Sequence, residues 1–262
     1  MKISLALSGT LLAVTLGISG AAWAQFGPPP HPTGPPPPAQ KAAPIDLTGY
    51  WVSIITEDWR WRMLTAPKGD YQSVPLNAAG IKLANTFSPA AYASGQIDCR
   101  AYGAAGLMRM PTRVHISWVN DNELQLQSDW GEQTRMIYFN KSDMPSAAPS
   151  LQGSSLAHWE FPVPIPNGMG FGPRRGPKPP GGDLAVMTDN LAPGWLRRNG
   201  VPYGTHTRLL EHYQTFQDPT GKTWFDVTTQ VDDPEYLNVP FITSSDFRKE
   251  PDGSKWAPHP CN

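Results

Sequence analysis

The sequence predicts an all-β protein, a single antiparallel barrel of about eight to ten strands with one short helix near its start. Two observations favour this fold class. From residue 112 onward, short segments alternate apolar and polar side chains, and Asn, Gly, Asp and Pro residues separate them. A helical pattern occurs only in residues 75–87, where Asn77 is placed to cap a helix.

Each predicted strand is a run of alternating side chains bounded by turn residues. The segment at residues 205–216 resembles a helix in places, but its β-branched start and its aromatic end favour a strand. The predicted strands cover the start of the domain and residues 112–118, 123–130, 133–139, 154–160, 183–189, 205–216, 223–231 and 241–250.

The first 45 residues are expected to lie outside the barrel. Lys2, an apolar run over residues 3–20 and the small-x-small triplet at residues 22–24 predict a signal peptide over residues 1–24; an uncleaved anchor is the alternative. Residues 25–45 are a Pro-rich linker. We therefore expect an exported protein, periplasmic or extracellular, without a membrane span in its mature chain. The barrel domain would span residues 46–262, with a Pro/Gly-rich loop insertion at residues 161–182.

The two cysteines and the charge balance narrow the chemistry. In an exported protein, Cys99 and Cys261 predict a structural disulfide. Without Lys2, 20 basic residues face 22 acidic ones, so nucleic-acid binding is a poor hypothesis. The six histidines show no metal-binding spacing, and we expect no metal and no cofactor.

The residues Gly49-Tyr50-Trp51, preceded by DLT, resemble the G-x-W motif on the first strand of lipocalins and other calycin barrels. More broadly, residues 46–261 resemble an uncharacterised family of secreted bacterial lipocalin-like proteins, through segments such as TGYWVSIITEDWRWRM and NGVPYGTHTRLLEHY. The resemblance implies that Trp51 points into the closed end of the barrel, against an arginine from a late strand. Arg248 is the natural candidate and Arg208 the alternative. The resemblance implies no catalytic residue.

Residues 46–63, DLTGYWVSIITEDWRWRM, look like one continuous strand. Counting by twos from Trp51 places Glu57, Trp59 and Trp61 on its face. If Trp51 points inward, that face lines the barrel interior, where one carboxylate would lie among tryptophans.

A carboxylate inside a barrel needs a partner. The alternatives for Glu57 are a structural ion pair, a polar contact that orients a ligand, and an acid or base in catalysis. Candidate partners come from three other predicted strands: Arg109, Arg113, His115, Arg135, Glu211 and Tyr213.

We therefore expect an exported cell-envelope protein that binds a small apolar or aromatic molecule in a Trp-lined barrel cavity. The alternative is an enzyme on the same barrel, an isomerase, lyase or hydratase that uses Glu57 or Glu211 as acid–base residues. Convergence of Glu57, His115 and Glu211 would favour the enzyme. The predicted ligand-binding residues are Trp51, Glu57, Trp59, Trp61, His115, Arg135, Glu211 and Tyr213.

Overall fold

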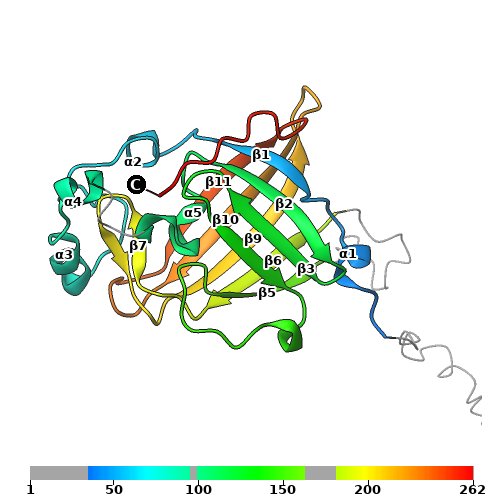
Figure 1. The fold of residues 1–262 in the computed structure, drawn as a ribbon, viewed down its shortest axis with the longest axis horizontal. Coiled ribbons are helices and arrows are strands. Elements are labelled where there is room, and N and C mark those ends of the chain that lie inside the picture. The colour runs from blue at the N-terminus through cyan, green and yellow to red at the C-terminus, as the bar shows by residue number, and fades with distance from the viewer. Residues whose placement is uncertain (1–34, 95–98, 163–180, 262) are drawn as a thin grey trace, which may run out of the picture. The chain divides into compact units, whose positions relative to one another are not determined.

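Nine strands close into a barrel in the computed structural model, which describes residues 35–94, 99–162 and 181–261 (Figure 1). The order around the barrel is β1-β11-β10-β9-β6-β5-β4-β3-β2. This confirms the predicted all-β fold class. The strands are β1 Gly49–Ile54, β2 Arg113–Asn120, β3 Glu123–Ser128, β4 Thr134–Tyr138, β5 Ser154–Glu160, β6 Asp183–Asp189, β9 Arg208–Gln217, β10 Thr223–Asp232 and β11 Phe241–Lys249.

One pair of neighbouring strands departs from the predicted antiparallel arrangement. β4 and β5 run parallel and pair only through Ile137 with Ser155 and Tyr138 with Leu156. In a parallel pair, the connecting chain must return to the end at which the first strand began, and the chain between β4 and β5 is long enough to do so. The barrel is therefore mixed, and this short parallel pair is the seam at which it closes.

The helices are short and more numerous than predicted. The predicted helix at residues 75–87 is confirmed in its central part as α3, and Asn77 caps it by accepting a hydrogen bond of 2.9 Å from the Gly80 amide. The remaining turns of helix have too few residues to leave a periodic signal in the sequence. The helices are α1 Ala39–Ala42, α2 Trp59–Arg62, α3 Ala78–Ala84, α4 Pro89–Ala93 and α5 Ala104–Leu107, with 3-10 turns at Arg100–Tyr102 and Lys141–Asp143.

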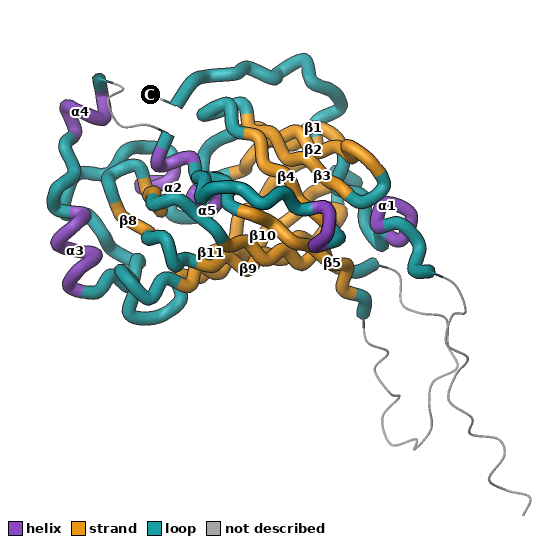
Figure 2. The backbone as a smooth tube through the Cα atoms, turned by 60° about the horizontal axis from the view of Figure 1, so that its bottom comes forward, coloured by secondary structure: helices purple, strands orange, loops and turns teal. Residues whose placement is uncertain are grey.

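A small hairpin outside the barrel accompanies most of these helices. Strands β7 (Gly194–Arg197) and β8 (Val201–Tyr203) pair with each other and not with the barrel. Gly200 in their turn has φ +82°, which glycine adopts without strain. Figures 1 and 2 both show the hairpin and α2 to α5 gathered beyond one end of the barrel, with α1 at the other end.

The continuous strand expected over residues 46–63 is wrong beyond Ile54. β1 ends there, Asp58 takes a left-handed conformation with φ +53°, and Trp59–Arg62 form the helical turn α2. The alternating pattern misled because the aromatic and basic side chains of this segment contact other loops rather than a neighbouring strand. Glu57, Trp59 and Trp61 consequently do not share the inward face of Trp51.

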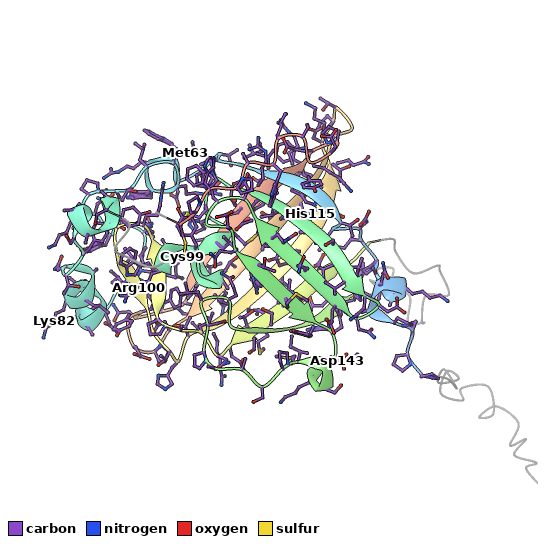
Figure 3. All side chains as sticks on the ribbon, viewed as in Figure 1. Met63, Lys82, Cys99, Arg100, His115 and Asp143 are labelled. Carbon is purple, nitrogen blue, oxygen red and sulfur yellow. A yellow bond between two sulfur atoms is a disulfide. The ribbon has the colours of Figure 1, made fainter. Side chains whose placement is uncertain are left out.

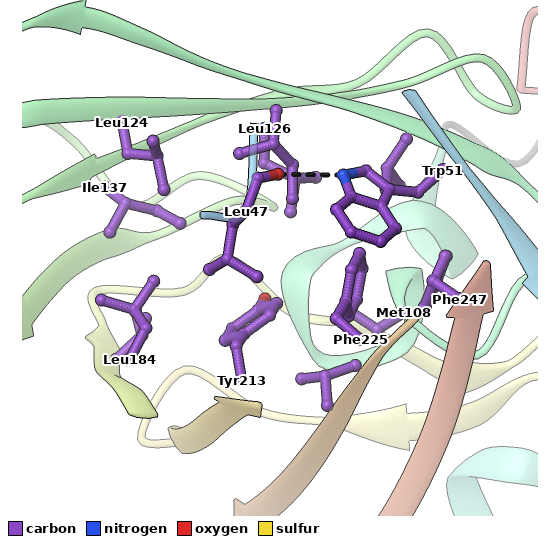
Figure 4. Close-up of a cluster of buried hydrophobic side chains, with 14 of the residues drawn as sticks. Leu47, Trp51, Met108, Leu124, Leu126, Ile137, Leu184, Tyr213, Phe225 and Phe247 are labelled. Carbon is purple, nitrogen blue, oxygen red and sulfur yellow. Dashed lines mark hydrogen bonds between the residues drawn. The ribbon is translucent and has the colours of Figure 1, made fainter. Parts of the chain in front are cut away.

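The barrel interior is packed with apolar side chains, drawn in part in Figure 4. Trp51 is buried, as predicted, and its indole N–H donates a 2.9 Å hydrogen bond to the Leu47 carbonyl. Its ring packs edge-on against Phe225, which stacks on Phe247 with centroids 4.7 Å apart. The main pockets formed by the described residues share no lining residue with this core.

The cation beside Trp51 is a lysine. Trp51 lies opposite Lys249 in the register of β1 and β11, and the Lys249 ammonium is 5.1 Å from the indole centroid. Arg248, the residue expected in this place, is one position away and therefore on the other face. Its guanidinium lies over the Trp224 ring instead, at 5.7 Å.

A fully buried ion pair crosses the barrel between Arg135 on β4 and Glu211 on β9. The guanidinium also donates to the hydroxyls of Ser155 on β5 at 3.0 Å and Thr188 on β6 at 2.6 Å. The Tyr213 hydroxyl donates to Glu211 at 3.1 Å. Burial alone would lower the pKa of Arg135, but the adjacent Glu211 carboxylate raises it above its ordinary value, so Arg135 stays charged.

Cys99 and Cys261 form the predicted disulfide, with Cα atoms 5.0 Å apart. It ties the C-terminal segment to the chain before α5, and Cys261 packs beside the buried cluster that contains Tyr102 and Trp195. β5 and β6 pair along their whole length, as expected for strands that flank the insertion at residues 161–182, whose central part lies outside the described residues. Residues 1–24 lie outside them as well. Within the described ranges, no helix has both the length and the apolar character needed to span a membrane.

Removing the disulfide is expected to lower the free energy of unfolding by about 2 to 5 kcal/mol, because the bridge restricts a long segment of the unfolded chain. The double variant Cys99→Ser/Cys261→Ser should show this loss in urea unfolding. Thiol titration of the unfolded, unreduced wild-type protein should find essentially no free thiol. Two titratable thiols would contradict the bridge.

Breaking the Arg135–Glu211 pair from one side should cost about 3 to 5 kcal/mol, because it leaves a buried charge without its partner. We expect Glu211→Leu and Arg135→Met each to show this loss in urea unfolding. The double variant should be more stable than either single variant, since no uncompensated charge remains. A double variant as unstable as the two losses added together would contradict a coupled pair.

Candidate functional site

The eight predicted ligand-binding residues are distributed over the barrel interior, the outer face of β2 and the α2 turn. Trp51 belongs to the packed barrel core, and Arg135, Glu211 and Tyr213 form the buried cluster across the barrel. His115 lies on the outer face of β2, where its ring stacks on Tyr50 at 4.2 Å (Figure 3 labels His115). The remaining three residues, Glu57, Trp59 and Trp61, lie in or beside α2.

The carboxylates and the histidine named for acid–base chemistry do not converge. Glu57 pairs with Arg62 and accepts a 2.6 Å hydrogen bond from the Thr56 hydroxyl. Glu211 is saturated inside the barrel by Arg135 and Tyr213, and His115 faces outward. No two of these three side chains therefore lie where they could act on the same bound substrate.

The α2 segment lies beside a cluster of arginines at the end of the barrel where α2 to α5 gather. Buried Arg62 donates to the Arg109 carbonyl at 3.1 Å, and Arg109 pairs with Asp58 at 2.7 Å. Trp61 lies between the guanidinium groups of Arg60 and Arg197, at 5.0 and 4.8 Å from its ring. We call Arg60, Arg62, Arg109, Arg197 and Arg198 the arginine cluster.

Arg197 and Arg198 have no carboxylate within ion-pair distance among the described residues, and of the two Arg197 is the more buried. Its side chain is buried, one terminal nitrogen donates to the Gln72 carbonyl at 2.7 Å, and its Nε and Nη2 have no partner. Burial and the nearby charge of Arg109 lower its pKa to about 10, although Asp58 and Asp70 partly oppose this. The side chain therefore carries a buried charge that the carboxylates of Asp58 and Asp70, beyond ion-pair distance, compensate only in part.

A groove of about 320 Å³ lies between α3, α4 and the β7–β8 hairpin, outside the barrel. Phe87 and Trp195 provide aromatic walls and pack against each other edge-to-face, with ring centroids 5.5 Å apart. None of the eight predicted residues lines this groove. Its lining residues are Leu83, Thr86, Phe87, Ser88, Ala91, Arg100, Pro193, Gly194, Trp195, Gly200, Pro202, Tyr203 and Tyr236.

Two polar groups of the groove lack partners among the described residues. The buried Tyr203 hydroxyl makes no hydrogen bond, and burial raises its pKa. A Cβ atom at Gly194 would lie 2.4 Å from that hydroxyl oxygen, so only glycine fits there. Arg100 is exposed at the groove and makes no ion pair with any residue that the structure describes (Figure 3 labels Arg100). The groove thus combines aromatic walls with an exposed guanidinium that has no ion pair among the described residues.

A wider depression of about 650 Å³ lies beside the end of β9, between Asp189 and Pro234, but no Phe, Tyr or Trp lines it. Its histidine, His206, already contacts Glu235 at 2.7 Å. The described residues contain no group of three or more His, Cys, Asp or Glu side chains that could hold a metal ion.

The groove residues and Arg197 were not identified from the sequence, although one signal pointed to them. The segment PGWLRRNGVPY, residues 193–203, contains an Asn-Gly turn between apolar and basic residues. That turn predicts a hairpin carrying Trp195, Arg197 and Tyr203, which is the hairpin observed as β7–β8. Arg62 gave no separate signal, because its contacts come from residues distant in the chain.

The closed barrel agrees with the architecture of calycin proteins, whereas membership of a secreted lipocalin-like family stays a prediction. Compared with protein-family models, with curated proteins and with solved structures, the chain has no match.

Proposed function

We propose that this protein is a non-catalytic binding protein of the cell envelope that holds a small aromatic or apolar molecule bearing an acidic group. The proposed site is the groove between α3, α4 and the β7–β8 hairpin. The observation that carries the proposal is an aromatic-walled groove of about 320 Å³ with the exposed guanidinium of Arg100, which has no ion pair among the described residues, at its edge.

The volume and the lining support a small ligand. Ligand pockets in proteins start at about 300 Å³ and are mostly apolar with a few polar groups that orient the ligand. Phe87 and Trp195 offer faces and edges on which a planar ring can pack. Arg100 offers a charge-assisted contact for a carboxylate.

The proposal keeps the predicted class of ligand and moves its location. Because its own side chains fill the barrel interior, we assign the barrel the role of a scaffold, as in a calycin-like fold with a filled interior. The separation of Glu57, His115 and Glu211 supports binding over acid–base catalysis.

We expect 2-naphthoate to bind saturably and to quench tryptophan emission, because Trp195 lines the groove. Ala91→Phe, which fills the groove from α4, should abolish this binding. Ala90→Phe is the matched control, since Ala90 belongs to the same helix, is exposed and does not line the groove. Equal binding by wild type and Ala91→Phe would place the ligand elsewhere.

The charge contribution is tested separately. Arg100→Gln should weaken 2-naphthoate binding about three- to five-fold, the effect of one solvent-exposed ion pair, and should leave binding of neutral 2-naphthamide unchanged. Lys82→Gln removes a positive charge from the exposed face of α3 and should change neither affinity. Equal loss for the acid and the amide would contradict a charge contact.

Export is tested on the native protein. Mass spectrometry of the chain recovered from the cell envelope should find Gln25 as the first residue, because a signal peptidase cleaves after small-x-small triplets. A cytoplasmic, full-length chain would contradict export without affecting the groove.

A further inference from the structure

The arginine cluster holds more positive than negative charge. Three of its five guanidinium groups have a carboxylate partner: Arg60 with Asp70, Arg62 with Glu57 and Arg109 with Asp58. Arg197 and Arg198 have none within ion-pair distance among the described residues. An excess of cations in a partly buried region costs free energy unless an anion compensates it.

The N–H groups of Arg197 that have no hydrogen-bond acceptor mark the place where a negative charge is missing. Only 4% of this residue is exposed, so water replaces the missing partners poorly, and its Nε and Nη2 remain without hydrogen bonds. The Arg197 guanidinium lies over the Trp61 ring, with its central carbon 4.8 Å from the ring centroid. Buried polar groups without a hydrogen-bond partner are rare in native structures, and a bound anion would satisfy both donors with charge-assisted hydrogen bonds.

The available space limits the size of that anion. A cavity of about 10 Å³ lies among these arginines, about the room that one water molecule needs. A halide ion is only slightly larger than water, whereas a phosphate or sulfate would have to displace side chains. The cavity is lined by Trp61, Arg62, Gly106, Arg109, Met110, Leu196, Arg197 and Arg198.

We propose that a small inorganic anion of halide size binds in this cavity and is held by the free Nε–H and Nη2–H of Arg197, with Arg109 contributing its positive charge. The site is distinct from the groove, with which it shares no lining residue. The anion completes the contact between α2, the α5 segment and β7, three elements that cover this end of the barrel.

The proposal is tested by thermal unfolding in potassium chloride and potassium gluconate mixtures at constant ionic strength, since gluconate is too bulky for the cavity. The wild-type midpoint should rise saturably with chloride, by about 3 to 6 °C at ten times the dissociation constant. Arg197→Met should lose this rise. Arg248→Met should keep it, because it removes another arginine that stacks on a tryptophan but lies outside the cluster.

Two further results would overturn the proposal. An equal chloride response in wild type and Arg197→Met would show that the anion acts elsewhere, and an Arg197-dependent response to sulfate as large as that to chloride would refute the size limit. Should Arg197→Met fail to fold, bromide-soaked crystals of the wild type decide the question. An anomalous peak within hydrogen-bond distance of Arg197 is expected, and its absence at saturating bromide refutes the site.

Discussion

The buried pair of Arg135 and Glu211 is the interaction on which the closed barrel depends most. The seam between β4 and β5 has only two paired positions, so backbone hydrogen bonds alone hold it weakly. Arg135 reaches across it to Ser155 and Thr188 and ends on Glu211, joining β4, β5, β6 and β9. One guanidinium thus connects four neighbouring strands, and its full set of partners offsets the cost of burying a charge.

A barrel closed in this way has little space left for a ligand. Its interior holds the stacked and edge-on rings of Trp51, Phe225 and Phe247, further apolar side chains of the same core, and the hydrogen-bonded cluster around Arg135. Sites that can accept molecules are therefore built by the segments beyond the strand ends. The hairpin β7–β8 contributes to both, because it carries Trp195 at the groove and Arg197 at the arginine cluster.

The two sites illustrate opposite uses of unpaired polar groups. At the groove, Arg100 is exposed, so its charge is solvated at little cost and is available for an incoming carboxylate. At the arginine cluster, Arg197 is buried, and its charge favours a permanent small anion. Burial therefore distinguishes an exchangeable contact from a structural one, although both depend on arginine.

The sequence by itself determined the strand content, the cap at Asn77 and the pairing of the two cysteines, because each depends on local periodicity or on simple exclusion, whereas the inward position of Trp51 was implied by the resemblance of its motif to that of lipocalins. Only the tertiary structure decided that the strand ends at Ile54 although the alternating sequence pattern continues. Arg62 and Trp61 find partners in Arg109 and Arg197, which are distant in the chain. The tertiary structure also decided the parallel seam and both sites, because convergence of distant loops leaves no periodic trace in a sequence.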